Sequence, residues 1–97
     1  MKPLIYRLEQ NYPNPFNPAT IIGYTIAGVR DLASGVSNVR LAVYDLIGRE
    51  VAVLVDEKQP MGTYEVTFDG ARLPSGMYLS RLEAGGNVFV KKMVLLK

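Results

Sequence analysis

One stretch organises the rest of the chain: Gln10-Asn11-Tyr12-Pro13-Asn14-Pro15-Phe16-Asn17-Pro18-Ala19-Thr20. It contains three of the six prolines in the sequence. Each proline fixes its own φ and lacks a backbone donor, and each drives the residue before it into extended backbone. Asn14 and Asn17 can fold their side chains back onto the backbone two residues on, as Asx-turns. We therefore expect a stiff loop that is neither helix nor paired strand.

Two aromatic residues, Tyr12 and Phe16, lie inside this loop. Large apolar rings of this kind favour burial, so we expect both to hold the loop against a core. One interpretation of the loop is a rigid corner between two strands, since Pro and Asn are turn residues for steric reasons. The other is a recognition loop, because a pre-ordered loop loses little entropy on binding.

On both sides of the loop, apolar and polar residues alternate with the period of two that is typical of half-buried strands. This alternation puts Val39, Leu41 and Val43 on one inward face, and it also predicts that four aromatic residues point inward. These are Tyr24, Tyr64, Phe68 and Tyr78. The predicted strands cover residues 4–8, 20–26, 38–45, 50–55, 62–69, 76–83 and 88–96.

Turn residues separate the strands. We expect a long loop over 27–37, a tight connection over 45–50 in which Gly48 takes a positive φ, and a polar turn over 56–62. Apolar residues occupy both parities of the last strand, which leaves its facing open and allows a bulge or sheet switch near Lys91. About seven short strands without a helical period predict an all-β, immunoglobulin-like antiparallel β-sandwich.

The composition limits the function. Ninety-seven residues make one domain, 1–97, in which residues 1–7 combine a possible linker remnant with the first strand. The chain has no Cys and no His, which excludes disulfides, the usual zinc sites and histidine-dependent nucleophiles. The net charge is +2 with the basic residues scattered, so no nucleic-acid partner is expected. No phosphate-binding or calcium loop is present, and we expect neither an enzyme nor a cofactor nor a metal site.

The lysines Lys91, Lys92 and Lys97 have two interpretations. Lysines on an outer strand discourage strand-to-strand aggregation, or their charges are read by a receptor. An exposed edge strand can also add to the sheet of a partner. Two rival functions remain open: a structural module that forms homo-oligomers through its edge strands, and a carbohydrate-binding module, which needs several aromatic side chains exposed in a row.

Five ordered blocks of the sequence carry a family resemblance: residues 8–20, 43–51, 62–66, 73–78 and 91–97. Together they resemble the type A C-terminal sorting domain of type IX (Por) secretion, which is similar to FlgD-like immunoglobulin modules. The loop over 27–37 is longer than the turn expected in that family. By motif position, the family's loop block corresponds to Asn14, Pro15, Phe16, Asn17 and Pro18, its Gly-x-Tyr block to Gly76 and Tyr78, and its basic last strand to Lys91, Lys92 and Lys97.

The resemblance implies a non-catalytic sorting and recognition domain at the C-terminus of a larger exported protein. Its expected partners are an outer-membrane translocon and a sortase-like peptidase that cuts the domain off, N-terminal to the sandwich. The passenger domain and the export signal are expected upstream. The implied location is the periplasm in transit, and then the outer-membrane surface or the extracellular space.

Overall fold

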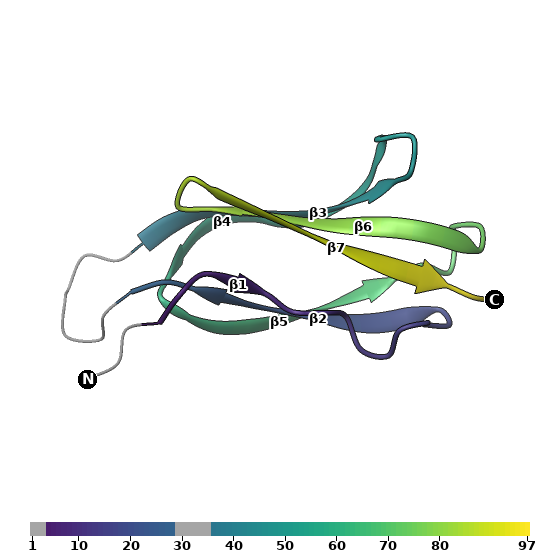
Figure 1. Cartoon of the computed structure of the whole chain (residues 1–97), viewed down its shortest axis with the longest axis horizontal. Coiled ribbons are helices and arrows are strands. Elements are labelled where there is room, and N and C mark those ends of the chain that lie inside the picture. The colour runs from purple at the N-terminus through teal and green to yellow at the C-terminus, as the bar shows by residue number, and fades with distance from the viewer. Residues whose placement is uncertain (1–3, 29–35) are drawn as a thin grey trace.

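The computed structural model describes residues 4–28 and 36–97, and its regular elements there are all strands. The strands are β1 (Arg7–Leu8), β2 (Ala19–Ile26), β3 (Val36–Asp45), β4 (Glu50–Pro60), β5 (Gly62–Asp69), β6 (Gly76–Ala84) and β7 (Asn87–Leu95). They form a three-stranded sheet in the order β1-β2-β5 and a four-stranded sheet in the order β4-β3-β6-β7, and every pair is antiparallel (Figure 1). The prediction of a seven-stranded β-sandwich is confirmed.

The connections follow the immunoglobulin-like pattern. The hairpins β3–β4 and β6–β7 stay within one sheet, whereas the chain changes sheets from β4 to β5 and from β5 to β6. In the β3–β4 hairpin Gly48 has a φ of 95°, as predicted, and the carboxylate of Asp45 accepts hydrogen bonds from the backbone of Ile47 and Arg49. These bonds and the Arg49 side chain hold the pKa of Asp45 below its usual value, with the Arg49 backbone bond as the main cause.

The core lies between the two sheets and consists of the inward residues of each strand. Val39, Leu41 and Val43 are all at most 2% exposed, which confirms the facing predicted for β3. Phe68 and Tyr78 are buried as expected, and Tyr64 is half-buried. The alternation of apolar and polar residues therefore placed the centre of the core correctly, because side chains on a strand point to opposite faces in turn.

One polar contact crosses the core between the sheets. The Tyr24 hydroxyl of β2 donates a 2.6 Å hydrogen bond to Oε1 of Gln59 in β4, and the Tyr24 ring stacks on Tyr64 with centroids 5.2 Å apart. Burial raises the pKa of Tyr24, and the bond to Gln59 opposes that shift. Both partners are at most 9% exposed, so each satisfies a group that water does not reach.

Replacing Tyr24 by phenylalanine is expected to lower the free energy of unfolding by about 1–3 kcal/mol, because Gln59 Oε1 is then left buried without that donor. Equilibrium urea unfolding measures the change. The matched control is Tyr64→Phe, which removes a hydroxyl that bonds the Pro60 carbonyl at an exposed position and should cost about 0.5 kcal/mol or less. Equal losses in the two variants would contradict the assignment.

The predicted polar turn over 56–62 is wrong, since β4 continues to Pro60 and Met61 alone separates it from β5. The reason is the partner strand: β3 begins at Val36 and pairs in register with β4 from Arg40–Asp56 to Val36–Pro60. On the exposed edge of a sheet, polar residues and a proline are tolerated.

The predicted loop over 27–37 is likewise corrected, because Val36 and Ser37 belong to β3, while residues 29–35 lie outside the described residues. The first strand is shorter than predicted, with only Arg7–Leu8 as β1 and an isolated bridge between Leu4 and Gly28. β3 pairs with β4 from Val36 onward. The alternation of residues along one segment does not show where a distant strand extends it.

The pairing of β7 with β6 shows which side chains of β7 point into the core. Its pairing with β6 runs without interruption from Gly76–Leu95 to Ala84–Asn87, so there is no bulge or sheet switch near Lys91. Met93 and Leu95 point into the core and are completely buried, whereas Val88 and Val90 lie on the outer face at 52% and 49% exposure. Register irregularities occur instead in the β3–β4 pair, around Ala42.

Candidate functional site

The proline loop, residues 10–18, lies along the second half of β7 and takes the place of a neighbouring strand. The Phe16 N–H donates to the Val94 carbonyl at 2.9 Å, and the Leu96 N–H donates to the Phe16 carbonyl at 3.0 Å. Phe16 and Leu95 form a parallel bridge. The sequence blocks at the two ends of the chain thus meet at one edge of the four-stranded sheet.

Two side chains of the proline loop also form hydrogen bonds with the backbone of β7. Oδ1 of Asn14 accepts a 2.9 Å hydrogen bond from the Val94 N–H, and Nε2 of Gln10 donates to the Lys92 carbonyl at 2.6 Å. The backbone groups that β7 directs away from β6 between Lys92 and Leu96 are therefore largely paired. We call this stretch the capped half of β7.

The loop is held in place by one aromatic ring. Phe16 is 1% exposed and meets Phe68 edge-on with ring centroids 5.9 Å apart. Gly70 lies directly beside it, since a Cβ there would come within 3.3 Å of the Phe16 ring and 3.0 Å of Leu95. The prediction for Tyr12 is wrong: its ring is 79% exposed, and Tyr12 holds the loop only through backbone hydrogen bonds with Ile21.

A buried polar network at the base of the loop was missed by the sequence reasoning. Nδ2 of Asn11 donates to the Pro13 carbonyl and to Oγ1 of Thr20, both at 3.1 Å, and Thr20 donates to the same carbonyl at 2.8 Å. Asn11 is 3% and Thr20 2% exposed. The side-chain-to-backbone bond two residues on was expected of Asn14 and Asn17, and it occurs at Asn11 instead.

The Gly-x-Tyr block forms a tyrosine corner. Tyr78, near the start of β6, is 4% exposed, and its hydroxyl donates a 2.6 Å hydrogen bond to the Pro74 carbonyl across the β5–β6 turn, an arrangement typical of immunoglobulin-like domains. Gly76 has a φ of 153°, which favours glycine. The Tyr78 side chain is therefore occupied within the fold, and both residues shape the turn beside the end of β7.

The three lysines differ in their surroundings. Lys91 and Lys92 are exposed on β7, the edge strand of its sheet. Lys97 is held at the β5–β6 turn, where its N–H donates to Ser75 Oγ at 3.0 Å and its Nζ to the Ala71 carbonyl. Of the loop residues, Asn14, Pro15 and Asn17 are exposed, Pro18 is half-buried and Phe16 is buried.

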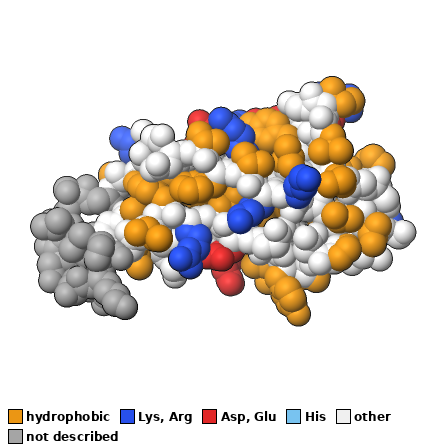
Figure 2. Space-filling model, viewed as in Figure 1, with side chains coloured by type: hydrophobic (Ala, Val, Ile, Leu, Met, Phe, Trp, Pro, Cys, Tyr) orange, Lys and Arg blue, Asp and Glu red, His pale blue; other side chains and the backbone are white. Residues whose placement is uncertain are grey.

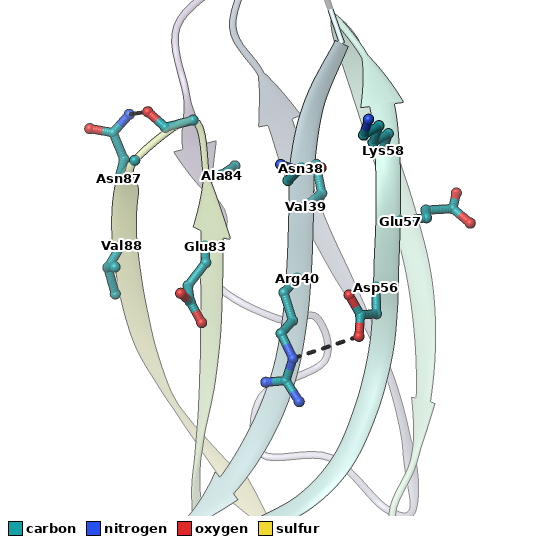
Figure 3. A pocket seen from close by; sticks show the side chains of 12 residues that line it. Asn38, Val39, Arg40, Asp56, Glu57, Lys58, Glu83, Ala84, Asn87 and Val88 are labelled. Carbon is teal, nitrogen blue, oxygen red and sulfur yellow. Dashed lines mark hydrogen bonds and ion pairs between the residues drawn. The ribbon is translucent and has the colours of Figure 1, made fainter.

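Several cavities open on the described part of the chain, and two of them involve the four-stranded sheet and its turns. One of about 580 Å³ opens on the four-stranded sheet, where Arg40 of β3 points toward Asp56 of β4 at 3.9 Å (Figure 3). Arg40 also pairs with Glu50 at 2.8 Å, and hydrogen bonds to Glu50 and then Tyr44 raise its pKa. A second cavity of about 330 Å³ lies between the β3–β4 hairpin and residues 73–78 and includes Ile47 and Met77.

Across residues 4–28 and 36–97, His, Cys, Asp and Glu nowhere gather in threes with the spacing to hold a metal ion. The same part of the chain contains no helix with the length and apolarity needed to cross a bilayer. Tyr24 and Tyr78 are buried, which removes both from any sugar-binding row of aromatic side chains.

Comparison with known proteins identifies one family. A family model described as a secretion system C-terminal sorting domain matches residues 10–96. The match begins at the first residue of the proline loop and ends just beyond the last residue of β7. No curated protein matches the chain at a significant level.

Proposed function

Since the chain belongs to the family of secretion system C-terminal sorting domains, we propose that it directs a passenger protein through a type IX machinery by presenting the proline loop and the capped half of β7 as one rigid surface. The family implies an exported protein and an interaction with that machinery. The observation that carries the proposal is the direct pairing of Phe16 with Val94 and Leu96, which joins two of the blocks that resemble the family.

The residues proposed for recognition divide into two groups by exposure. Asn14, Pro15 and Asn17 of the loop are exposed, as are Lys91, Lys92 and Lys97, and their side chains can reach a translocon component. The others shape this surface from within: Phe16, Pro18, Gly76 and Tyr78. A rigid surface of this kind binds with little loss of conformational entropy.

The later steps of the proposal come from the resemblance. After transit through the outer membrane, a sortase-like peptidase removes the domain upstream of β1, and the passenger remains at the cell surface or leaves the cell. The domain itself acts as a non-catalytic signal. This family of sorting domains is not known as catalytic.

The test is a transplant. The chain is fused through a short linker to the C-terminus of a fluorescent passenger with an export signal, in a bacterium with a working type IX system. Export of the passenger is expected with the intact chain and retention in the periplasm without residues 91–97. Because that deletion also removes the buried Met93 and Leu95, a second variant is needed that leaves the core intact.

The second variant is Asn17→Ala combined with Lys91→Gln, Lys92→Gln and Lys97→Gln, all at exposed positions. We expect export to fall by about tenfold or more, which corresponds to about 1.4 kcal/mol of lost interaction. The control is Lys58→Gln on β4, which is exposed at the opposite edge of the same sheet. Export that is unaffected by the quadruple variant, or absent with the intact chain, would contradict the proposal.

A further inference from the structure

The edge of β7 is covered over only one half. The backbone groups of Lys92, Val94 and Leu96 that bond the proline loop face away from β6. Backbone groups alternate along an antiparallel strand, so the N–H and C=O groups of Val88 and Val90 face the same way. β1 of the other sheet lies close to β7, but within the described part of the chain no strand is hydrogen-bonded to β7 on this side, and no backbone hydrogen bond outside the β6 pairing reaches these two residues.

The open half, residues 88–92, has the features of a strand that accepts another strand. Its pairing with β6 is regular, so no bulge twists the edge away. Val88 and Val90 are about half exposed, and Lys91 and Lys92 are exposed beside them. Figure 2 shows basic and hydrophobic side chains together in the middle of the face on which β7 lies.

The positive charges of Lys91 and Lys92 determine which kind of strand can bind at the open half of β7. Two copies of the chain paired antiparallel about Val90 would set Lys91 opposite Phe89 and Lys92 opposite Val88, with the two Lys91 side chains at diagonal positions. Such a ladder would gather four positive charges and offer them no carboxylate partner. Lysine on an edge strand is also a known device against self-pairing. An incoming strand with carboxylates beside the lysines and β-branched residues beside the valines would instead find complementary partners.

We propose that residues 88–92 of β7 receive an extended acidic segment of a partner protein as an added edge strand. This inference rests on the proposed function and names the chemistry of the partner that reads the domain. The open N–H and C=O groups of Val88 and Val90 supply the main-chain hydrogen bonds, and the lysines supply the selectivity for acidic sequences. The site ends at Lys92, because the Lys92 carbonyl already accepts a hydrogen bond from Gln10 of the proline loop.

The direct test uses two synthetic peptides, Thr-Glu-Glu-Val-Thr-Val-Thr, which in antiparallel pairing sets a Glu beside each lysine and a Val beside each valine, and the same peptide with Lys at each Glu position, both with blocked ends. Calorimetric titration measures binding to the whole chain, and amide hydrogen exchange measured by NMR locates the binding. The acidic peptide is expected to bind and to slow exchange at the Val88 and Val90 amides. The basic peptide is expected to do neither.

Two variants test the edge itself. Val90→Pro removes an N–H that faces away from β6, so it removes no bond of the sheet, and proline is tolerated on edges. This variant should weaken binding of the acidic peptide by about tenfold or more, which corresponds to about 1.4 kcal/mol. Lys91→Glu with Lys92→Glu should reverse the preference toward the basic peptide, while the control Lys58→Glu on β4 should leave the preference unchanged.

The outcomes separate the two proposals. Equal binding of both peptides, or binding that neither variant changes, overturns the inference. So does a concentration-dependent dimer in sedimentation that Val90→Pro abolishes, because the occupant is then a second copy. In the transplant, normal export with both edge variants overturns the inference and leaves the sorting role in place. Peptide binding as expected from a chain that does not export its passenger supports the edge site and refutes the sorting role.

Discussion

Replacing Phe16 by alanine is expected to lower the free energy of unfolding by about 3–5 kcal/mol. The ring is 1% exposed and lies against Phe68, with Gly70 and Leu95 in close contact. Its removal leaves a cavity that neighbours on rigid strands fill poorly. A domain of this size is stable by only about 5–15 kcal/mol in total, so this one ring accounts for a large share of the stability.

Equilibrium urea unfolding measures this loss, and two variants calibrate it. Phe16→Leu keeps much of the volume and should cost clearly less than the alanine variant. Tyr12→Ala removes the other aromatic ring of the same loop, which is 79% exposed, and should change stability by about 0.5 kcal/mol or less. If Phe16→Ala costs no more than Tyr12→Ala, Phe16 does not hold the loop.

The Phe16 variant also reports on the edge of β7. The hydrogen bonds of Val94 and Leu96 to Phe16 depend on the position of the loop, so their amides should exchange faster in Phe16→Ala under conditions in which the domain stays folded. Local opening of this kind has its own free energy, separate from global unfolding. Unchanged exchange at both amides would show that the loop stays on β7 without its ring.

Replacing Asn11 by aspartate is expected to cost on the order of 3 kcal/mol at pH 7. The Asn11 amide donates to the Pro13 carbonyl and to Thr20 in a site where it is 3% exposed. A carboxylate has the same shape and can still accept the hydrogen bond from Gln10 Nε2, but it cannot donate, so its second oxygen would face the Pro13 carbonyl without a donor between them. The loss should appear as a lower midpoint of urea unfolding.

The effect of this variant has a definite pH dependence. Burial raises the pKa of the new carboxyl group above its unfolded value of about 3.9, so the neutral form is favoured in the folded state. The penalty is therefore full above the folded pKa, and it shrinks as the pH falls toward the unfolded pKa. Stability relative to the parent chain, compared at each pH, should recover on acidification.

The matched control for the charge is Asn14→Asp, three positions along the same loop. Asn14 is exposed, and its Oδ1 accepts the bond from the Val94 N–H, a role that a carboxylate also performs. Its stability should change little and without a recovery at low pH. Equal losses in the two variants would show that the added negative charge, rather than the lost donor of Asn11, destabilises the loop.

Much of this architecture is local and was therefore predictable. A period of two on β3 and β5 depends only on neighbouring residues, and it correctly indicated the inward faces through residues such as Leu41 and Phe68. The turn at Gly48 was also predictable, because glycine readily adopts the positive φ that this turn requires. The residues of the candidate site were named by the family resemblance, yet their shared position along β7 was not visible in the chain.

The sequence by itself thus determined the fold class and the inward faces of the strands, because propensity and alternation act over a few residues. It placed both aromatic rings of the proline loop in the core, which holds for Phe16 and fails for Tyr12. Only the tertiary structure decided that the loop caps β7, that Asn11 and Tyr78 are bonded within the fold, and that β4 continues to Pro60. Each of these depends on which distant strand lies alongside, since a buried polar group or an edge takes its partner from the assembled sheets.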